Sequence, residues 1–163
     1  MLQKIDLLSL IPADELFPLV EELLRDGRDV VISARGNSMY PLIRSDKDTV
    51  KLTAANYNDV KKGAITLVRR DSGAYVIHRV CKITPVLFYM VGDHQQEIEG
   101  PLRPDQLIAM VTEVHRGKHT IRRGSLLWVV FARIWLFLRP IRRQVLAMLI
   151  ALRSLVKRFM YRR

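Results

Sequence analysis

The sequence predicts a mainly β protein of the α+β class, in which helices flank a single sheet domain. Short segments rich in Val, Ile and Tyr recur between residues 29 and 122, and Gly, Asp, Asn or Pro separate them. No segment with the length and periodicity of a helix lies between them. Short strands in direct succession pair antiparallel, so we expect a coiled antiparallel sheet or a small barrel. With 163 residues, 49% of them hydrophobic, the chain is long enough for one domain.

Residues 13–26 predict an amphipathic helix. Apolar side chains recur there at helical spacing: Leu16, Phe17, Val20, Leu23 and Leu24. Gly27 follows directly and favours the end of a helix. Such a stripe is typical of a helix that packs on a domain, so we assign residues 1–28 to an N-terminal helical cap.

Residues 29–122 predict one β domain built from short strands. Each predicted strand is rich in apolar residues, and turn-forming residues lie close to its ends. The expected strands are 29–34, 48–53, 64–69, 74–83, 86–91, 107–115 and 118–122.

The C-terminal segment, residues 123–163, is apolar and strongly basic. Residues 1–113 contain 14 Lys and Arg against 16 Asp and Glu, whereas residues 114–163 contain 13 Lys and Arg and no acid. The net charge of +11 therefore belongs to the tail. Nucleic-acid binding is one interpretation of this charge, but the tail is too apolar for a soluble basic groove, so we expect no nucleic-acid partner.

We predict two helices in the tail, one over residues 125–138 and one after Pro140, because proline interrupts a helix. The first would be about 20 Å long, shorter than the roughly 30 Å hydrocarbon core of a bilayer. Trp128, Trp135 and the arginines suit a membrane interface. We therefore expect residues 125–163 to lie on a membrane surface without crossing it. The alternative is that these helices pack on the domain or on a second copy, which leaves the oligomeric state open.

Composition excludes several other classes of protein. The single cysteine, Cys81, excludes an internal disulfide framework and a cysteine-based zinc site, and we expect no cofactor. Asp6, Asp14 and Glu15 interrupt the apolar N-terminal stretch, which argues against a signal peptide. An uncharged apolar run of about 18 residues or more is also absent. These features favour a domain on the cytoplasmic side of the membrane.

A serine at residue 38 lies in the segment RGNSMYP, residues 35–41, directly after a predicted strand. Gly36 permits a tight turn and Pro41 stiffens the chain that follows. A serine between them presents its hydroxyl from a rigid turn, with backbone N–H groups nearby, as a nucleophile requires. The other interpretation is a turn serine that hydrogen-bonds to its own backbone.

A histidine and an acidic cluster are the other candidate site residues. His78 lies in the predicted strand YVIHRV, where a neutral imidazole is the usual base for a serine hydroxyl. Asp93, Glu97 and Glu99 lie close together in VGDHQQEIEGP, residues 91–101. One of them is a candidate to orient the His78 ring. The alternatives are an ordinary strand histidine and a solvated loop.

These segments together resemble the signal peptidase and self-cleaving-repressor superfamily of serine proteases, over about residues 30–115. GNSMYPLIRSDKDTV is similar to its nucleophile box, in which Ser38, Met39 and Pro41 match. YVIHRVCKI looks like the second catalytic box, and VGDHQQEIEG looks like the acidic box of the endoplasmic-reticulum and archaeal-type members. His78, followed by arginine and valine, matches the histidine type rather than the lysine type, although Lys82 is an alternative base.

The resemblance implies a signal-peptidase-like catalytic domain over residues 29–122, with Ser38 as nucleophile and His78 as general base. The third member is Asp93, Glu97 or Glu99, with Asp93 slightly favoured by its Gly-Asp turn, unless the site is a dyad. The remaining roles concern the substrate. The Ser38 N–H and the Asn37 side chain would form the oxyanion hole, and Met39 and Tyr40 would line the substrate pocket.

We therefore expect a serine endopeptidase that cleaves a peptide, or a leader or signal segment, through an acyl-enzyme. The cytoplasmic placement favours a specialised substrate, such as the leader of a ribosomally made peptide. One alternative is a catalytically inactive or self-processing relative that binds peptides. The sequence argues against a repressor, because about 30 residues before the first strand cannot hold a helix-turn-helix domain.

Overall fold

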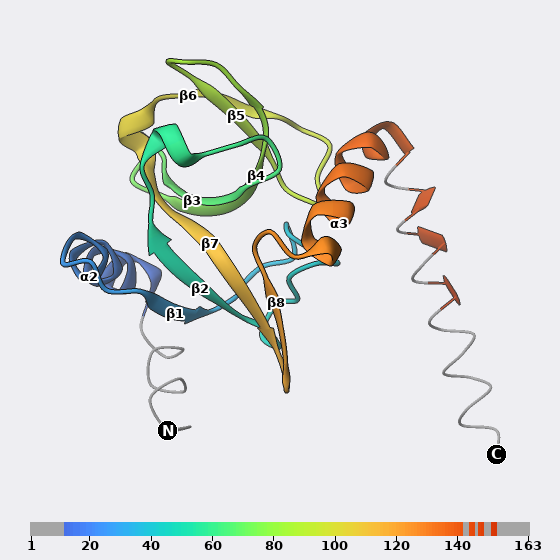
Figure 1. The fold of residues 1–163 in the computed structure, drawn as a ribbon, viewed down its shortest axis with the longest axis horizontal. Coiled ribbons are helices and arrows are strands. Elements are labelled where there is room, and N and C mark those ends of the chain that lie inside the picture. Colours follow the sequence, from blue (N-terminus) through green and yellow to red (C-terminus); the bar gives the residue numbers. More distant parts are fainter. Residues whose placement is uncertain (1–11, 142–143, 146, 149–150, 153–163) are drawn as a thin grey trace.

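The computed structural model describes residues 12–141, 144–145, 147–148 and 151–152, and it has the predicted mainly β architecture (Figure 1). The helices are α2 (Ala13–Arg25) and α3 (Leu126–Phe137). The strands are β1 (Val30–Ser33), β2 (Thr49–Ala54), β3 (Ile65–Arg69), β4 (Tyr75–Ile83), β5 (Phe88–Val91), β6 (Glu99–Leu102), β7 (Leu107–Arg116) and β8 (His119–Arg122). Short 3₁₀ turns lie at Tyr57–Asp59, Pro104–Gln106 and Arg139–Ile141.

The strands of the described residues form one open antiparallel sheet. Its order is β1-β2-β7-β3-β4-β5-β6, with β8 paired to β7. The sheet curls strongly but leaves β1 and β6 as free edges, so it is not a closed barrel (Figure 1). The expected strands are present, with ends shifted by up to two residues. Such shifts are usual because pairing partners define where a strand stops.

Strand β6 is the element that the sequence pattern did not predict. Its residues EGPL include Gly100 and Pro101 and show no alternation of apolar and polar side chains, so the sequence predicts a loop over residues 91–101. Pairing with β5 makes it a strand, with Phe88 opposite Leu102 and Met90 opposite Glu99. Proline is tolerated there because β6 is an edge strand. The pairing matters for function because it brings Glu99 to the sheet.

Two apolar clusters hold the sheet and its helices together. One joins α2, β1, β2 and β7 to the segment after Ser38, through the buried side chains of Met39, Leu42 and Ile43. The second lies within the curl of β3 to β7 and includes Val80, Phe88 and Met90. Each fully buried side chain of this size contributes about 1.5–3 kcal/mol. The Ser38 segment is thus attached to the core by its own apolar residues.

Helix α3 packs on the β domain through one face. Ser125 caps it, accepting a hydrogen bond from the Trp128 N–H (3.3 Å). Trp128, Ala132 and Trp135 are 4%, 6% and 4% exposed. The expectation that both tryptophans face a membrane is therefore wrong, because tertiary packing buries them against the domain. Within the described residues, no helix is both long enough and apolar enough to cross a membrane.

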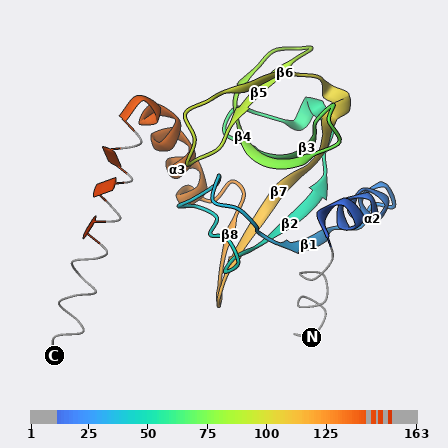
Figure 2. The ribbon, with the colours of Figure 1, turned by 180° about the vertical axis from the view of Figure 1, so that it is seen from behind.

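The two helices lie on opposite sides of the molecule, α2 beside β1 and α3 beside the chain that follows β5 (Figures 1 and 2). Pro140 lies in the 3₁₀ turn just beyond α3, as expected for a residue that interrupts a helix. The second predicted helix, with most of residues 142–163, lies largely outside the described residues.

Candidate active site

Ser38 lies in a tight turn between β1 and β2. Gly36 has a φ of +80°, the left-handed region that glycine adopts without strain. The Tyr40 N–H donates to the Asn37 carbonyl (3.1 Å), which closes the turn around Ser38. The Ser38 side chain is half-buried, and its hydroxyl makes no hydrogen bond within the described part of the chain. The turn therefore leaves the hydroxyl available for another partner.

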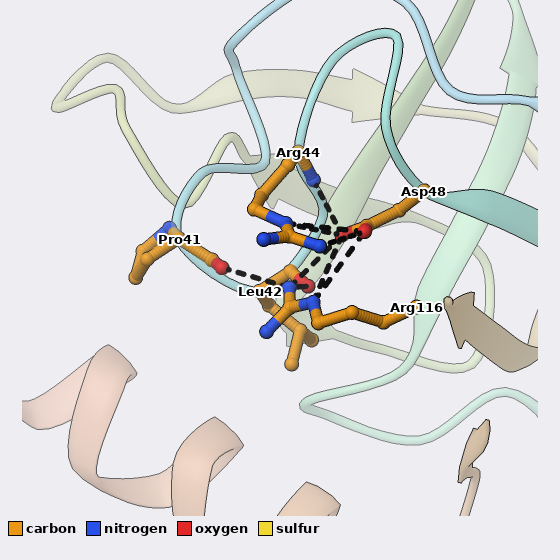
Figure 3. Close-up of polar contacts among 5 residues, drawn as sticks. All are labelled: Pro41, Leu42, Arg44, Asp48 and Arg116. Carbon is orange, nitrogen blue, oxygen red and sulfur yellow. Dashed lines mark hydrogen bonds and ion pairs between the residues drawn. The ribbon is translucent and has the colours of Figure 1, made fainter. Parts of the chain in front are cut away.

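A buried charge cluster clamps the far end of this turn (Figure 3). Asp48, 1% exposed, accepts hydrogen bonds from Arg44 Nη2 (2.8 Å) and Arg116 Nη2 (2.9 Å). Arg116, at the end of β7, also donates to the carbonyls of Leu42 (2.6 Å) and Pro41 (3.3 Å). Burial opposes ionisation of Asp48, but the two arginines outweigh it and lower its pKa. The sheet thus holds the Ser38 turn by charge-assisted bonds as well as by packing.

His78 is buried on β4, and Glu99 is the carboxylate beside it. The ring is 3% exposed, and Nδ1 lies 3.4 Å from Glu99 Oε2, too poorly aligned to count as a hydrogen bond. Glu99 is held on its other side by Arg70, which donates through both Nε and Nη2, the latter at 2.7 Å. Burial lowers the pKa of His78, and the Glu99 charge offsets part of that effect. The hydrogen bond from Arg70 lowers the pKa of Glu99.

Asp93, which the sequence slightly favours as the third member, has a different partner. Its carboxylate accepts from Arg79 Nε (2.8 Å) and Nη2 (2.6 Å), and both side chains are fully buried. Arg79 also donates to the Gly63 carbonyl (2.9 Å). Both carboxylate oxygens of Asp93 are thus used by a fork-shaped ion pair beside His78. Glu97 is exposed and makes no hydrogen bond or ion pair in the described residues.

Ser38 lines an apolar cavity, and His94, which is bonded to the Ser38 carbonyl, lines a second hollow that is polar. The apolar cavity, about 260 Å³, has Ser38, Met39 and residues 75–77 of β4 in its wall, together with parts of β1 and α2. His78, the next residue of β4, lines the polar hollow with Arg70, Glu99 and His94. The His94 N–H donates to the Ser38 carbonyl (2.7 Å) and so joins the two walls.

Strand pairing adds a second link between these residues. Arg79, the residue after His78, pairs with Val91, the residue before Gly92. A Cβ at Gly92 would lie 2.7 Å from the Ser38 carbonyl oxygen, so the two backbones are in close contact. Within the described residues no hydrogen bond joins Ser38 to His78. The sheet places the turn of Ser38 next to the strand of His78 without that bond.

The other predicted site residues are distributed around this junction. The Ser38 N–H donates to no protein acceptor in the described residues, and Asn37 is exposed beside it. Met39 is buried in the wall of the apolar cavity. Tyr40 is not in that wall, and its ring stands edge-on to His94 with the centroids 6.1 Å apart. Lys82, the alternative base, follows a β-bulge and lies over the Tyr89 ring, 5.1 Å from its centroid.

Three residues near the site were missed by the sequence reasoning. Arg79 and Arg116 are buried or half-buried cations on strands, and Trp135 donates from Nε1 to the Asp93 carbonyl (2.7 Å). The signal for Arg79 was present, because an arginine inside an apolar strand needs a buried carboxylate. The sequence gives no indication of the hydrogen bond from Trp135, because its partner, Asp93, is 42 residues away in the chain.

The fold and the geometry of the candidate site are the basis for assigning a function, because comparisons with known proteins found no match. The chain is a mainly β protein of the α+β class with an open antiparallel sheet. A scan against protein-family models found no match, and searches of curated proteins and of solved structures found none either.

If His78 acts as a base through Nε2, peptide cleavage should have an acid limb below the ordinary histidine pKa, because burial lowers the pKa of His78. The base works only when neutral, so activity should persist to lower pH than an ordinary histidine base would allow and fall as the pH drops through the lowered pKa. Glu99→Gln removes the negative charge that favours the protonated ring. We expect it to move the acid limb to still lower pH and to reduce kcat by about 10²-fold or more.

The measurement is the pH dependence of kcat, with Glu97→Gln as the matched control. Glu97 lines the same hollow but does not contact the ring, so its variant should keep the wild-type acid limb. An acid limb that stays in place or moves upward in Glu99→Gln would show that Glu99 is not coupled to His78.

Proposed function

We propose that the chain is a serine endopeptidase related to signal peptidases, with Ser38 as nucleophile and His78 as general base. The observation that carries this proposal is the position of His78 relative to Glu99 and to Ser38. A carboxylate, Glu99, lies beside Nδ1 of a buried histidine, and the strand of that histidine shares a cavity wall with Ser38. A carboxylate at Nδ1 favours the tautomer with its proton there, which leaves Nε2 free to accept one.

The proposed reaction proceeds in two steps. Ser38 Oγ attacks the peptide carbonyl carbon while His78 Nε2 takes its proton. The proton passes to the leaving amine as the C–N bond breaks, leaving an acyl ester on Ser38. Water then attacks the acyl carbon and His78 accepts one of its protons. The bond between the acyl carbon and Ser38 Oγ breaks, the peptide acid leaves, and that proton returns to Oγ. The Ser38 N–H, with Asn37 beside it, is the proposed donor to the oxyanion.

The proposed substrate is an extended peptide with apolar side chains before the cleaved bond. The outer edge of β1 carries no strand partner in the described residues, so a peptide could pair along it. That edge borders the apolar cavity, where Ile32, Met39 and Phe17 offer hydrophobic surface. Backbone pairing would supply affinity, and the cavity would select alternate side chains.

The experiment that tests the proposal is cleavage of a proteome-derived peptide library, with products identified by mass spectrometry. We expect the full-length protein to cut after apolar residues and the Ser38→Ala variant to leave the library intact. No product above the level of the Ser38→Ala variant would overturn the proposal.

A peptide-binding protein without catalysis is the second candidate, and one observation favours it. No hydrogen bond joins Ser38 and His78 in the described residues. A protein that only binds peptides needs no such bond, whereas the proposed peptidase must form it when substrate binds, as catalytic hydrogen bonds often do. Binding of library peptides without new products would identify the second.

We also propose that the outer face of α3 docks on an anionic membrane surface. Leu127, Val130, Ile134, Phe137 and Ile141 recur every three or four residues and are 61%, 43%, 50%, 83% and 49% exposed. We call these five residues the outer stripe. The chain from residue 114 onward carries 13 basic residues and no acid, which opposes pairing with a second copy and favours an anionic partner.

The triple variant Leu127→Glu, Ile134→Glu, Phe137→Glu should lose most of its binding to vesicles that contain phosphatidylserine. Each basic residue near such a surface contributes about 1 kcal/mol, and apolar burial by the stripe adds to this. Sedimentation of full-length protein with vesicles, at low and high salt, measures the effect. Val86→Glu, at an equally exposed apolar residue in the β4–β5 turn, is the matched control.

Wild-type protein should pellet with anionic vesicles and be partly released by salt. Equal pelleting of the triple variant and the wild type would show that the outer stripe is not the docking surface. The full chain is needed because removal of α3 would uncover the surface on which Trp128 and Trp135 pack.

A further inference from the structure

The inner face of α3 contacts the segment that joins β5 to β6. Trp135 Nε1 donates to the Asp93 carbonyl at 2.7 Å, and this bond is buried. Phe131 stacks on Trp135, with ring centroids 5.1 Å apart, and lies 5.6 Å from the Arg79 guanidinium carbon. Ala132 lies close to Gly63, whose carbonyl accepts from Arg79. One helix face therefore covers the Arg79–Asp93 ion pair and also holds the Asp93 backbone.

Residues 92–94 in turn contact the site itself. Gly92 lies against the Ser38 carbonyl, and the His94 N–H donates to the same oxygen (2.7 Å). The Asp93 side chain pairs with Arg79, the residue after His78. This three-residue segment, held by Trp135, is thus the link between α3 and both proposed catalytic residues.

We propose that Trp135 is a positioning residue of the Ser38–His78 site, acting through the Asp93 carbonyl. The inference rests on the proposed function and deepens it by adding α3 to the elements that set its rate. Shifts of about 1 Å in a reacting group can cost on the order of 10²-fold in rate. Loss of the indole N–H frees the Asp93 carbonyl, and the segment that fixes Ser38 then loses one of its attachments.

The test compares Trp135→Phe with Trp128→Phe in the full-length protein. Both tryptophans are buried on the same helix face, but no described residue accepts a hydrogen bond from the Trp128 indole. With the library peptide that the wild type cleaves best, Trp135→Phe should lower kcat by about 10- to 100-fold and change KM by less than about twofold. Trp128→Phe should change neither.

Hydrogen exchange gives a readout that does not depend on catalysis. The His94 amide hydrogen, which the Ser38 carbonyl accepts, should exchange faster in Trp135→Phe than in wild type and at the wild-type rate in Trp128→Phe. Equal kcat and equal His94 exchange in the two variants would overturn the inference.

Two further arms keep the test decisive. If Trp135→Phe does not fold, β-(3-benzothienyl)alanine replaces Trp135 in the Trp128→Phe background. This residue keeps the shape of the indole ring and removes only its N–H. The kcat and the His94 amide exchange are then compared as before. If the wild type cleaves no library peptide, the proposed function fails. The exchange comparison then decides by itself whether Trp135 holds the segment of His94 against Ser38.

Discussion

Ser38→Ala and His78→Ala should each lower the rate of peptide cleavage by about 10⁴-fold or more, while the protein remains folded. Ser38 supplies the attacking oxygen and His78 the proton acceptor, so loss of either stops acylation. The double variant should be no slower than the slower single variant, because the two residues act as one unit. Cleavage of the best library peptide, with circular dichroism as the check on folding, measures these effects.

Two variants control for general damage to the site. His94→Ala removes an exposed histidine from the hollow that His78 lines, and Lys82→Ala removes the alternative base. Both should keep cleavage within about tenfold of wild type, because neither side chain takes part in the proposed proton transfer. Wild-type activity in Ser38→Ala would end the protease interpretation. A strong loss in Lys82→Ala with a mild loss in His78→Ala would make the lysine the base.

Asp93→Asn should lower the free energy of unfolding by about 3–5 kcal/mol, because it leaves the Arg79 charge buried without its partner. Both side chains are fully buried, and both carboxylate oxygens bind the guanidinium. Urea unfolding followed by circular dichroism measures the loss. In a double-mutant cycle with Arg79→Met, the double variant should be less destabilised than the sum of the two single variants.

Asp71→Asn is the matched control for this experiment. Asp71 also pairs with an arginine, Arg103 (2.8 Å), but its side chain is 74% exposed, and solvent screening leaves such a pair with little effect on stability. An Asp93→Asn protein as stable as wild type but unable to cleave peptide would contradict this prediction. It would restore Asp93 as the carboxylate that orients His78.

The strand and helix pattern was readable from the sequence because it depends on neighbours in the chain. The apolar period of residues 13–26 and the short runs between turn residues predicted α2 and seven of the strands. Strand β6 was missed because pairing with β5, rather than its own residues, makes it a strand. The open edge at β1 was equally undetermined, since the sequence favours neither an open sheet nor a closed barrel.

The candidate site likewise has features that the local sequence predicts and features that depend on contacts distant in the chain. The residue types were predictable from the chain alone: a serine in a rigid turn, a histidine in a strand and an acidic cluster after β5. Their partners depend on the fold, which sets Glu99 beside His78, pairs Asp93 with Arg79 and packs the two tryptophans on the domain. A buried charge or indole binds whichever complementary group the fold brings within about 3 Å. That group is often dozens of residues away, where no local pattern can indicate it.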